Sequence, residues 1–269
     1  MKLALAQFDI AAGKKGENID RALERIREAS DHGADLVALP EIFTVGYFAF
    51  DSYARTAESI DGPTLERIAE AARDNDIGIL AGSIVEDLAE SNADGVDVPA
   101  SDGYANTSVF FDTRGERRGV YRKQHLFGYD SAEADLLEPG ESLPTIEFEG
   151  FTVGMTTCYD LRFPELYREL VDAGATLVLV PSAWPYPRVE HWKLLPRARA
   201  VENLLYVATI NGVGRFEAAT LLGRSAVYDP WGTTVAAIGD EPGLVTVDVD
   251  PETVSRRRAE FEVLSDRRG

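Results

Sequence analysis

The sequence predicts an α/β fold, a four-layer α-β-β-α sandwich with two pseudo-symmetric halves. Short runs of β-branched residues alternate with amphipathic segments along the 269-residue chain, as in proteins built from βα units. Residues 32–40 (HGADLVALP) and 173–181 (AGATLVLVP) have nearly the same sequence, which indicates that the two halves are related. Because the buried strands are almost entirely apolar, we expect two sheets packed face to face with helices outside.

The first half of the chain is predicted to begin with a βα unit and to end in a hairpin. The helix over 18–30 is amphipathic, because Ile19, Leu23 and Ile26 fall at helical spacing. The polar loop over 91–103 has no periodic apolar face and is expected to be an exposed insertion. The remaining predicted elements are strands 2–9, 36–40 and 77–85, a helix over 64–73, and paired strands 106–112 and 119–122.

The second half repeats the alternation of strands and helices. Its predicted elements are strands 145–149 and 151–157 joined at Gly150, helix 164–172, strand 176–181, helix 189–204, strand 206–211, hairpin 225–238, strand 244–249 and a short Arg-rich helix from Pro251. Length alone would allow two domains, but sandwiches of this size often form one. We therefore expect a single domain over residues 1–269.

The composition argues against nucleic acids and anionic membranes as partners. The chain has 27 basic and 46 acidic residues, a net charge of −19. Apolar residues make up 45%, so the chain can form a core and the acids are expected on its surface. Five lysines stand against 22 arginines, and such Lys-poor, acidic surfaces are typical of proteins from salt-loving microbes.

The single cysteine, Cys158, cannot form an intramolecular disulfide. The N-terminal apolar run is too short for a signal peptide, and no apolar stretch approaches the roughly 18 residues of a membrane helix. We therefore expect a cytoplasmic protein in a reducing environment.

Cys158 is also a candidate nucleophile. It follows the predicted strand 151–157 and precedes a helix beginning at Pro164, and α/β proteins place reacting groups at such strand ends. A lone cysteine is more often a buried structural thiol. Here, however, the segment TTCYDLRFPE surrounds it with polar side chains that are costly to bury for packing alone, which favours a chemical role.

A cysteine nucleophile needs a base or a nearby cation. His32 and His191 lack an evident Asn or Asp to orient them, so a thiol-protease pair is weakly supported. Lys123 and Glu41 are polar groups that follow predicted strands. Taken singly, Lys123 could be a solvated side chain and Glu41 a helix cap or surface ion pair. The few His and Cys residues form no cluster with metal-site spacing, so no metal and no cofactor are expected.

Three segments together resemble the catalytic blocks of the nitrilase superfamily of carbon-nitrogen hydrolases. They are LPEIFTVGY around Glu41, YRKQHLF around Lys123 and TTCYDLRFPE around Cys158, followed downstream by ARAVENLLYVATIN (198–211). The resemblance extends from Leu3 to about Val249. It implies the same α-β-β-α sandwich, and a homodimer, or a higher homo-oligomer, packed across helices near the active site.

The resemblance also implies roles for individual residues. Glu41, Lys123 and Cys158 would form the triad, in which Glu41 is the general base, Cys158 forms a thioester, and Lys123 favours the thiolate and stabilises the oxyanion with the backbone N–H of Tyr159. A second glutamate would orient Lys123 and the substrate amide. The stretch EADLLEPG places it at Glu133, with Glu138 as the less favoured position.

The substrate is expected to be a small molecule. The segment SAWPYPRVEHW (182–192) resembles the ω-amidase (2-oxoglutaramate amidase) branch, which implies a dicarboxylic acid monoamide. Arg188 would then pair with the distal carboxylate, and Trp184, Tyr186 and Tyr47 would line the pocket.

Other interpretations of the sequence remain open. Arg188 could instead be a surface residue at a helix start, and the Pro-rich run a rigid loop. The family often has Asn where this chain has Ala183. N-carbamoyl-amine or N-carbamoyl-amino-acid hydrolysis is the alternative activity; nitrile hydrolysis is less favoured, because nitrilases usually have Trp at the position of Tyr159. An inactive interaction scaffold is a further alternative.

Overall fold

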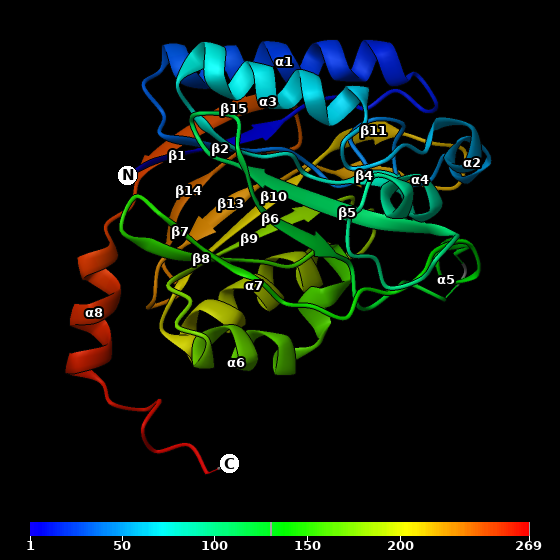
Figure 1. The fold of residues 1–269 in the computed structure, drawn as a ribbon. Helices are drawn as coiled ribbons and strands as arrows, with labels where there is room; N and C mark the ends of the chain where they lie inside the picture. Colours follow the sequence, from blue (N-terminus) through cyan, green and yellow to red (C-terminus); the bar gives the residue numbers. More distant parts are fainter. Residues whose placement is uncertain (130, 269) are drawn as a thin grey trace.

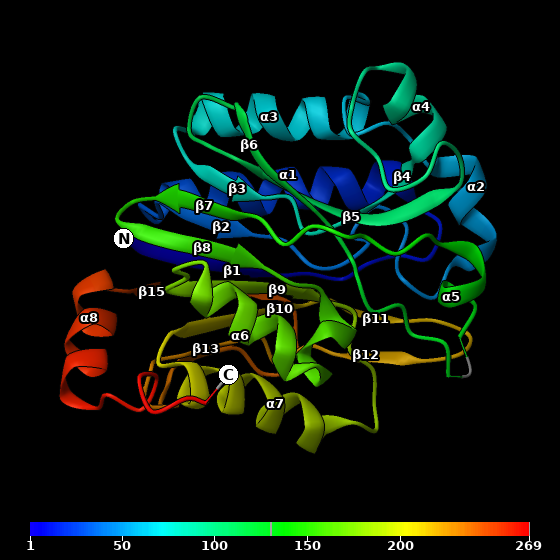
Figure 2. The ribbon, with the colours of Figure 1, turned by 60° about the horizontal axis from the view of Figure 1, so that its bottom comes forward.

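The computed structural model describes residues 1–129 and 131–268. Two sheets face each other, and helices cover their outer faces (Figure 1; Figure 2). Helices α1 (Lys15–Asp31) and α3 (Pro63–Asn75) pack on one sheet, and α6 (Pro164–Asp172) and α7 (Val189–Asn203) on the other. The predicted four-layer sandwich is therefore confirmed. No helix among the described residues is long and apolar enough to cross a membrane.

The first sheet has the strand order β15-β1-β2-β3-β5-β4, with β6 paired to β5. Its strands are β1 (Lys2–Gln7), β2 (Leu36–Ala38), β3 (Gly78–Leu80), β4 (Ile84–Asp87), β5 (Tyr104–Phe111), β6 (Arg117–Arg122) and β15 (Gly243–Asp248). Strand β15 pairs antiparallel with β1, with Leu5 opposite Val245, so the late part of the chain returns to its beginning.

The second sheet has the order β14-β13-β10-β9-β8-β7. Its strands are β7 (Thr145–Phe148), β8 (Phe151–Met155), β9 (Leu177–Ser182), β10 (Tyr206–Asn211), β13 (Ala226–Tyr228) and β14 (Thr234–Ala237). A separate ribbon pairs β11 (Val213–Arg215) with β12 (Thr220–Leu222). The repeated segment noted in the sequence falls on β2 and on β9, each an interior strand of its sheet.

Alternation along the strands divides the core into layers. Leu3 and Leu5 of β1 belong to the apolar cluster between the sheets, whereas Ala4 and Ala6 belong to the cluster under α1 and α3. Small residues on the helix side allow the helices to approach closely, and large ones fill the space between the sheets. A third cluster lies under α6 and α7.

Two predicted elements differ in the structure. The predicted strand 77–85 is two strands, β3 and β4, because the chain turns at Gly82, whose φ is +47°. The predicted exposed loop 91–103 begins within helix α4 (Leu88–Ala93), where Asp87 caps the backbone N–H of Glu90 and Ser91 is buried. A short polar helix of this kind leaves no periodic apolar pattern in the sequence.

The remaining helical segments are short or lie near the C-terminus. They are η1 (Phe50–Ser52), α2 (Tyr53–Thr56), α5 (Glu133–Leu136), η2 (Cys158–Arg162) and α8 (Pro251–Glu260). Of these, α5 and η2 carry side chains of the candidate site.

Candidate active site

The candidate site lies where strands of both sheets end. Glu41 follows β2, Lys123 follows β6, and Cys158 opens η2 shortly after β8. Tyr121 of β6 belongs to the cluster between the sheets, and alternation places Lys123 on the same side. The three predicted residues thus meet at one end of the space between the two sheets, and all three are buried.

Lys123 is the centre of a buried charge cluster. Its Nζ donates to Glu41 Oε1 at 2.9 Å, and to Glu133 Oε1 and Oε2 at 2.8 and 2.9 Å. Glu133, on α5, also accepts from the Phe127 backbone N–H at 2.7 Å and from the Tyr47 hydroxyl at 3.0 Å. Glu138 is exposed, so Glu133 is the one of the two candidate glutamates that reaches Lys123.

The backbone at Cys158 is held in an unusual conformation. Its φ of +49° lies in the left-handed region, which is costly for a residue with a Cβ and often marks a functional position. The turn is fixed by a capping box between Thr157 and Asp160. Asp160 also accepts from the Tyr121 hydroxyl at 2.6 Å, which ties the turn to β6.

Burial raises the pKa of Glu41, and Glu133 raises it further, whereas Lys123 and a hydrogen bond to the Cys158 thiol lower it. Burial and Glu41 together hold the pKa of Cys158 well above its usual range, against an opposing effect of Lys123. Lys123 thus favours the thiolate, but burial and Glu41 favour the protonated thiol more strongly, so attack by the sulfur calls for a base. Burial lowers the pKa of Lys123, but the neighbouring carboxylates outweigh it, so the ammonium stays charged.

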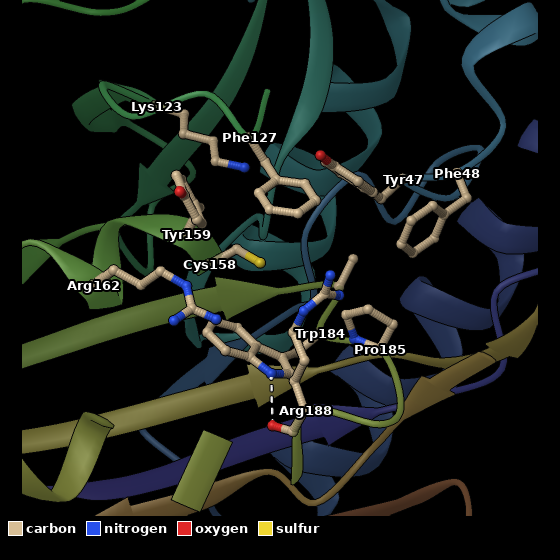
Figure 3. Close-up of a pocket in the computed structure, with 11 residues that line it drawn as sticks. Tyr47, Phe48, Lys123, Phe127, Cys158, Tyr159, Arg162, Trp184, Pro185 and Arg188 are labelled. Carbon is tan, nitrogen blue, oxygen red and sulfur yellow. Dashed lines mark hydrogen bonds between the residues drawn. The ribbon is translucent and has the colours of Figure 1, made fainter. Parts of the chain in front are cut away.

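A small pocket opens beside the thiol (Figure 3). It is lined by Tyr47, Phe48, Lys123, Phe127, Cys158, Tyr159, Arg162, Ala183, Trp184, Pro185 and Arg188. Its walls are largely aromatic, and two guanidinium groups border it. That of Arg162 lies 5.1 Å from the Trp184 ring, and that of Arg188 lies 5.4 Å from the Phe127 ring. A small ligand with an anionic end matches this lining.

Most of the substrate residues predicted from the sequence line this pocket. Tyr47, Tyr159, Trp184 and Arg188 all do so. The prediction for Tyr186 is wrong: the residue is 39% exposed and does not line the pocket, and its hydroxyl donates to Asp240 at 2.8 Å. Tyr186 and Asp240 are 54 positions apart in the chain, so their contact could not be predicted from the nearness of Tyr186 to Trp184 in the sequence.

Two polar residues at the site, Asn106 and Arg162, carried no prediction of a role. Asn106 on β5 donates to both buried glutamates, and Arg162 lines the pocket four residues after Cys158. Asn106 stands beside Thr107 and Ser108 in a mixed strand, so nothing in the sequence singled it out. Arg162 stands out in the sequence as one of the polar residues around Cys158, but the sequence does not indicate that it lines the pocket.

The whole-chain comparisons agree with this geometry. The family model described as carbon-nitrogen hydrolase matches residues 2–259. The chain belongs to the carbon-nitrogen hydrolase family. The resemblance predicted from the three sequence blocks is thus confirmed, and with it the expectation that the protein is an enzyme acting on C–N bonds.

Relatives of this carbon-nitrogen hydrolase are found both by sequence and by structure. It is 34% identical over 272 residues to the 2-oxoglutaramate amidase of Paenarthrobacter nicotinovorans, covering 97% of this chain and 90% of that one. It is similar in structure to Saccharomyces cerevisiae Nit3, a member of branch 10 of the nitrilase superfamily, with a TM-score of 0.88, 30% identity and coverage of 100% and 97% of the two chains.

A third relative is an amidase mutant from Nesterenkonia sp. AN1, with a TM-score of 0.78, 28% identity and coverage of 97% and 98%. In that structure acrylamide has added to the active-site cysteine by Michael addition.

Proposed function

We propose that this carbon-nitrogen hydrolase cleaves small primary amides through a thioester on Cys158. The observation that carries the proposal is the buried cluster of Glu41, Lys123 and Cys158 opening into a closely walled pocket. The Cys158 sulfur attacks the amide carbon, the C–N bond breaks, and ammonia leaves. Water then attacks the thioester, the C–S bond breaks, and the carboxylic acid leaves with the thiol restored.

Each polar group then has a task set by its surroundings. Glu41, whose pKa is raised by burial, takes the thiol proton and returns it to the departing nitrogen. Lys123 stays charged and stabilises the oxyanion, with help from the backbone N–H of Tyr159. Glu133 holds Lys123 in place. Its hydrogen bond to the Phe127 N–H also fixes the chain that follows Lys123.

We propose a dicarboxylic acid monoamide such as 2-oxoglutaramate as the substrate. Arg188 and Arg162 border the pocket, and either guanidinium can pair with a carboxylate at the end of the substrate remote from the amide. The similarity to a 2-oxoglutaramate amidase supports this choice. Because the net charge of −19 opposes an anionic ligand, attraction must come from these local cations.

Product analysis tests the substrate class. Incubation with 2-oxoglutaramate should release ammonia and the dicarboxylic acid without CO₂. Hydrolysis of N-carbamoyl substrates would instead release ammonia, CO₂ and the amine, and turnover of nitriles to acids would identify a nitrilase. The Arg188→Gln variant should raise KM for 2-oxoglutaramate about 10- to 100-fold, because a charge-assisted hydrogen bond is lost. Arg256→Gln, on the exposed face of α8, is the matched control. Inactivity on every dicarboxylic monoamide would refute the substrate proposal.

We also propose a homodimer formed across α6 and α7. Leu194 and Val201 lie seven residues apart on one face of α7 and are 64% and 43% exposed, although both are apolar. The Leu194→Glu variant should shift the mass measured by light scattering from twice 29.4 kDa to 29.4 kDa. Leu136→Glu, an exposed apolar position on α5, should leave the mass unchanged. A wild-type protein that is monomeric would contradict the proposal.

Finally, we propose that the protein works in the salt-rich, reducing cytoplasm of a salt-loving microbe. An excess of 19 acidic charges repels itself unless salt screens it, and the proposed nucleophile is a thiol that oxidation would block. The unfolding temperature should therefore rise steadily between dilute buffer and molar KCl. A flat dependence on salt would contradict this proposal.

A further inference from the structure

Asn106 lies inside the charge cluster without belonging to the proposed triad. It is fully buried on β5, and its carbonyl accepts from the Lys123 backbone N–H at 2.9 Å, so the two residues are adjacent. Its neighbour Thr107 faces away from the site and donates to Glu86. Alternation along the strand therefore directs the Asn106 side chain towards the site.

Both N–H groups of the Asn106 side-chain amide donate to the two buried carboxylates. Its Nδ2 donates to Glu41 Oε1 at 2.9 Å and to Glu133 Oε1 at 3.1 Å. Lys123 Nζ donates to the same two oxygens. Each of these oxygens consequently accepts two donors, one from an ammonium and one from an amide.

The orientation of this amide is determined by its surroundings. Asn106 Oδ1 is buried and has no hydrogen-bond partner among the described residues. An unpartnered buried carbonyl is unfavourable, yet the reversed amide would point its oxygen at two carboxylates, which is worse. The orphaned oxygen therefore indicates that donation to Glu41 and Glu133 is the dominant requirement at this position.

The second oxygen of Glu41 is in a different environment. Oε2 accepts from the Ala183 backbone N–H at 2.8 Å. Ala183 and Cys158 both line the same pocket. Oε2 is therefore the carboxylate oxygen on the thiol side, and it has one donor where Oε1 has two.

We propose that Asn106 is a positioning residue that, with Lys123, saturates Glu41 Oε1 and so directs the thiol proton to Oε2. This inference rests on the proposed role of Glu41. In the step concerned, the S–H bond breaks and an O–H bond forms at Oε2, while the electron pair left on sulfur attacks the amide carbon. In the next step the same proton moves from Oε2 to the departing nitrogen, so one oxygen serves both transfers.

Alkylation of the thiol by iodoacetate, which has no amide group, tests this inference without an amide substrate. Cys158 is the only cysteine, so the rate of modification by iodoacetate reports the deprotonation of this one thiol. In the wild type the rate should rise with pH as Glu41 ionises. In Asn106→Ala the rise should move about one pH unit higher, because ionised Glu41 loses a hydrogen-bond donor. With an amide substrate, kcat should fall about 10-fold or more while KM changes less than about threefold.

Two further variants make the result decisive. Asn203→Ala removes an equally buried amide on α7, and its alkylation profile should match the wild type. Asn106→Asp keeps the shape but can donate only when protonated, so its alkylation and turnover should fall over the pH range where those of the wild type rise. Circular dichroism checks that each variant is folded.

The outcomes separate this inference from the proposed function. An unshifted profile in folded Asn106→Ala, or an Asn106→Asp profile like that of the wild type, would overturn the role of Asn106. A wild type that is alkylated as expected but hydrolyses no amide would overturn the proposed function and leave the alkylation comparison standing.

Discussion

Replacing Gly82 by alanine should disturb the loop that carries Glu41. Gly82 has a φ of +47°, and a Cβ there would lie 2.0 Å from the Pro40 carbonyl oxygen and 2.8 Å from that of Leu39. Both atoms belong to the backbone leading directly into Glu41, so they cannot move aside as a side chain can. Ser83 also holds this loop, because its hydroxyl accepts from the Ile42 N–H at 2.8 Å.

The size of the effect follows from this geometry. The left-handed conformation costs alanine about 1–2 kcal/mol, and relieving the clash adds about 1–3 kcal/mol. Gly95 is the matched control, because its φ is +85° but nothing lies within 4 Å of its Cβ position. It should lose only the conformational part. At about 2 °C per kcal/mol for a chain of this size, Tm should fall by about 4–10 °C in Gly82→Ala and about 2–4 °C in Gly95→Ala.

Thermal unfolding and steady-state kinetics on the two variants check the reasoning. Gly82→Ala should also lower kcat well below the wild-type value at a temperature where it is fully folded, because Glu41 shifts with Pro40. Gly95→Ala should keep the wild-type kcat. Equal losses of Tm in both variants, or an unchanged kcat in Gly82→Ala, would refute the proposed coupling between this turn and the site.

Three further predictions concern charge. Burial raises the pKa of Glu41, and a general base must be ionised to act. The acidic limb of the pH profile of kcat/KM should therefore have its midpoint above the ordinary glutamate pKa of about 4.3. A midpoint at or below that value would count against Glu41 as the base. Lys123→Ala should lower kcat about 100- to 1000-fold. His125 follows Lys123 by two residues, and its Nδ1 lies 3.0 Å from Asp160 Oδ1. His125→Ala should lower kcat less than about 10-fold, whereas a thiol-protease mechanism predicts a larger loss from the histidine than from Lys123. Glu86→Ala leaves Arg122 buried without the carboxylate that it contacts at 2.7 and 2.8 Å. The free energy of unfolding measured by urea denaturation should therefore fall by about 3–5 kcal/mol. A fall of less than about 1 kcal/mol would show that the pair is not buried in solution.

The layers of this fold were predictable because they depend on local patterns. Apolar strands alternating with amphipathic helices, and the repeat now seen on β2 and β9, determine two sheets with outer helices. The break at Gly82 was not predictable, because the residues on either side of it read as one continuous strand. What ends the strand is the approach of a distant segment, Leu39–Pro40.

The site residues likewise divide into those that local sequence predicts and those that depend on distant contacts. Glu41, Lys123 and Cys158 stand in recognisable blocks, so their meeting could be predicted. Asn106 could not, because its function depends on register with Lys123 across two strands and not on its neighbours in sequence. Tyr186 was misplaced for a related reason, since its partner Asp240 is remote in the chain.

The most direct test of the account is the mass of the protein during turnover. Rapid acid quenching after mixing with 2-oxoglutaramate, followed by mass spectrometry, should find an acyl group on the peptide containing Cys158, and the mass of this peptide should increase by the mass of the substrate less ammonia. The Cys158→Ala variant should fold, carry no adduct and release no ammonia. Ammonia release by Cys158→Ala at the wild-type rate would contradict the central claim that hydrolysis passes through a thioester at this residue.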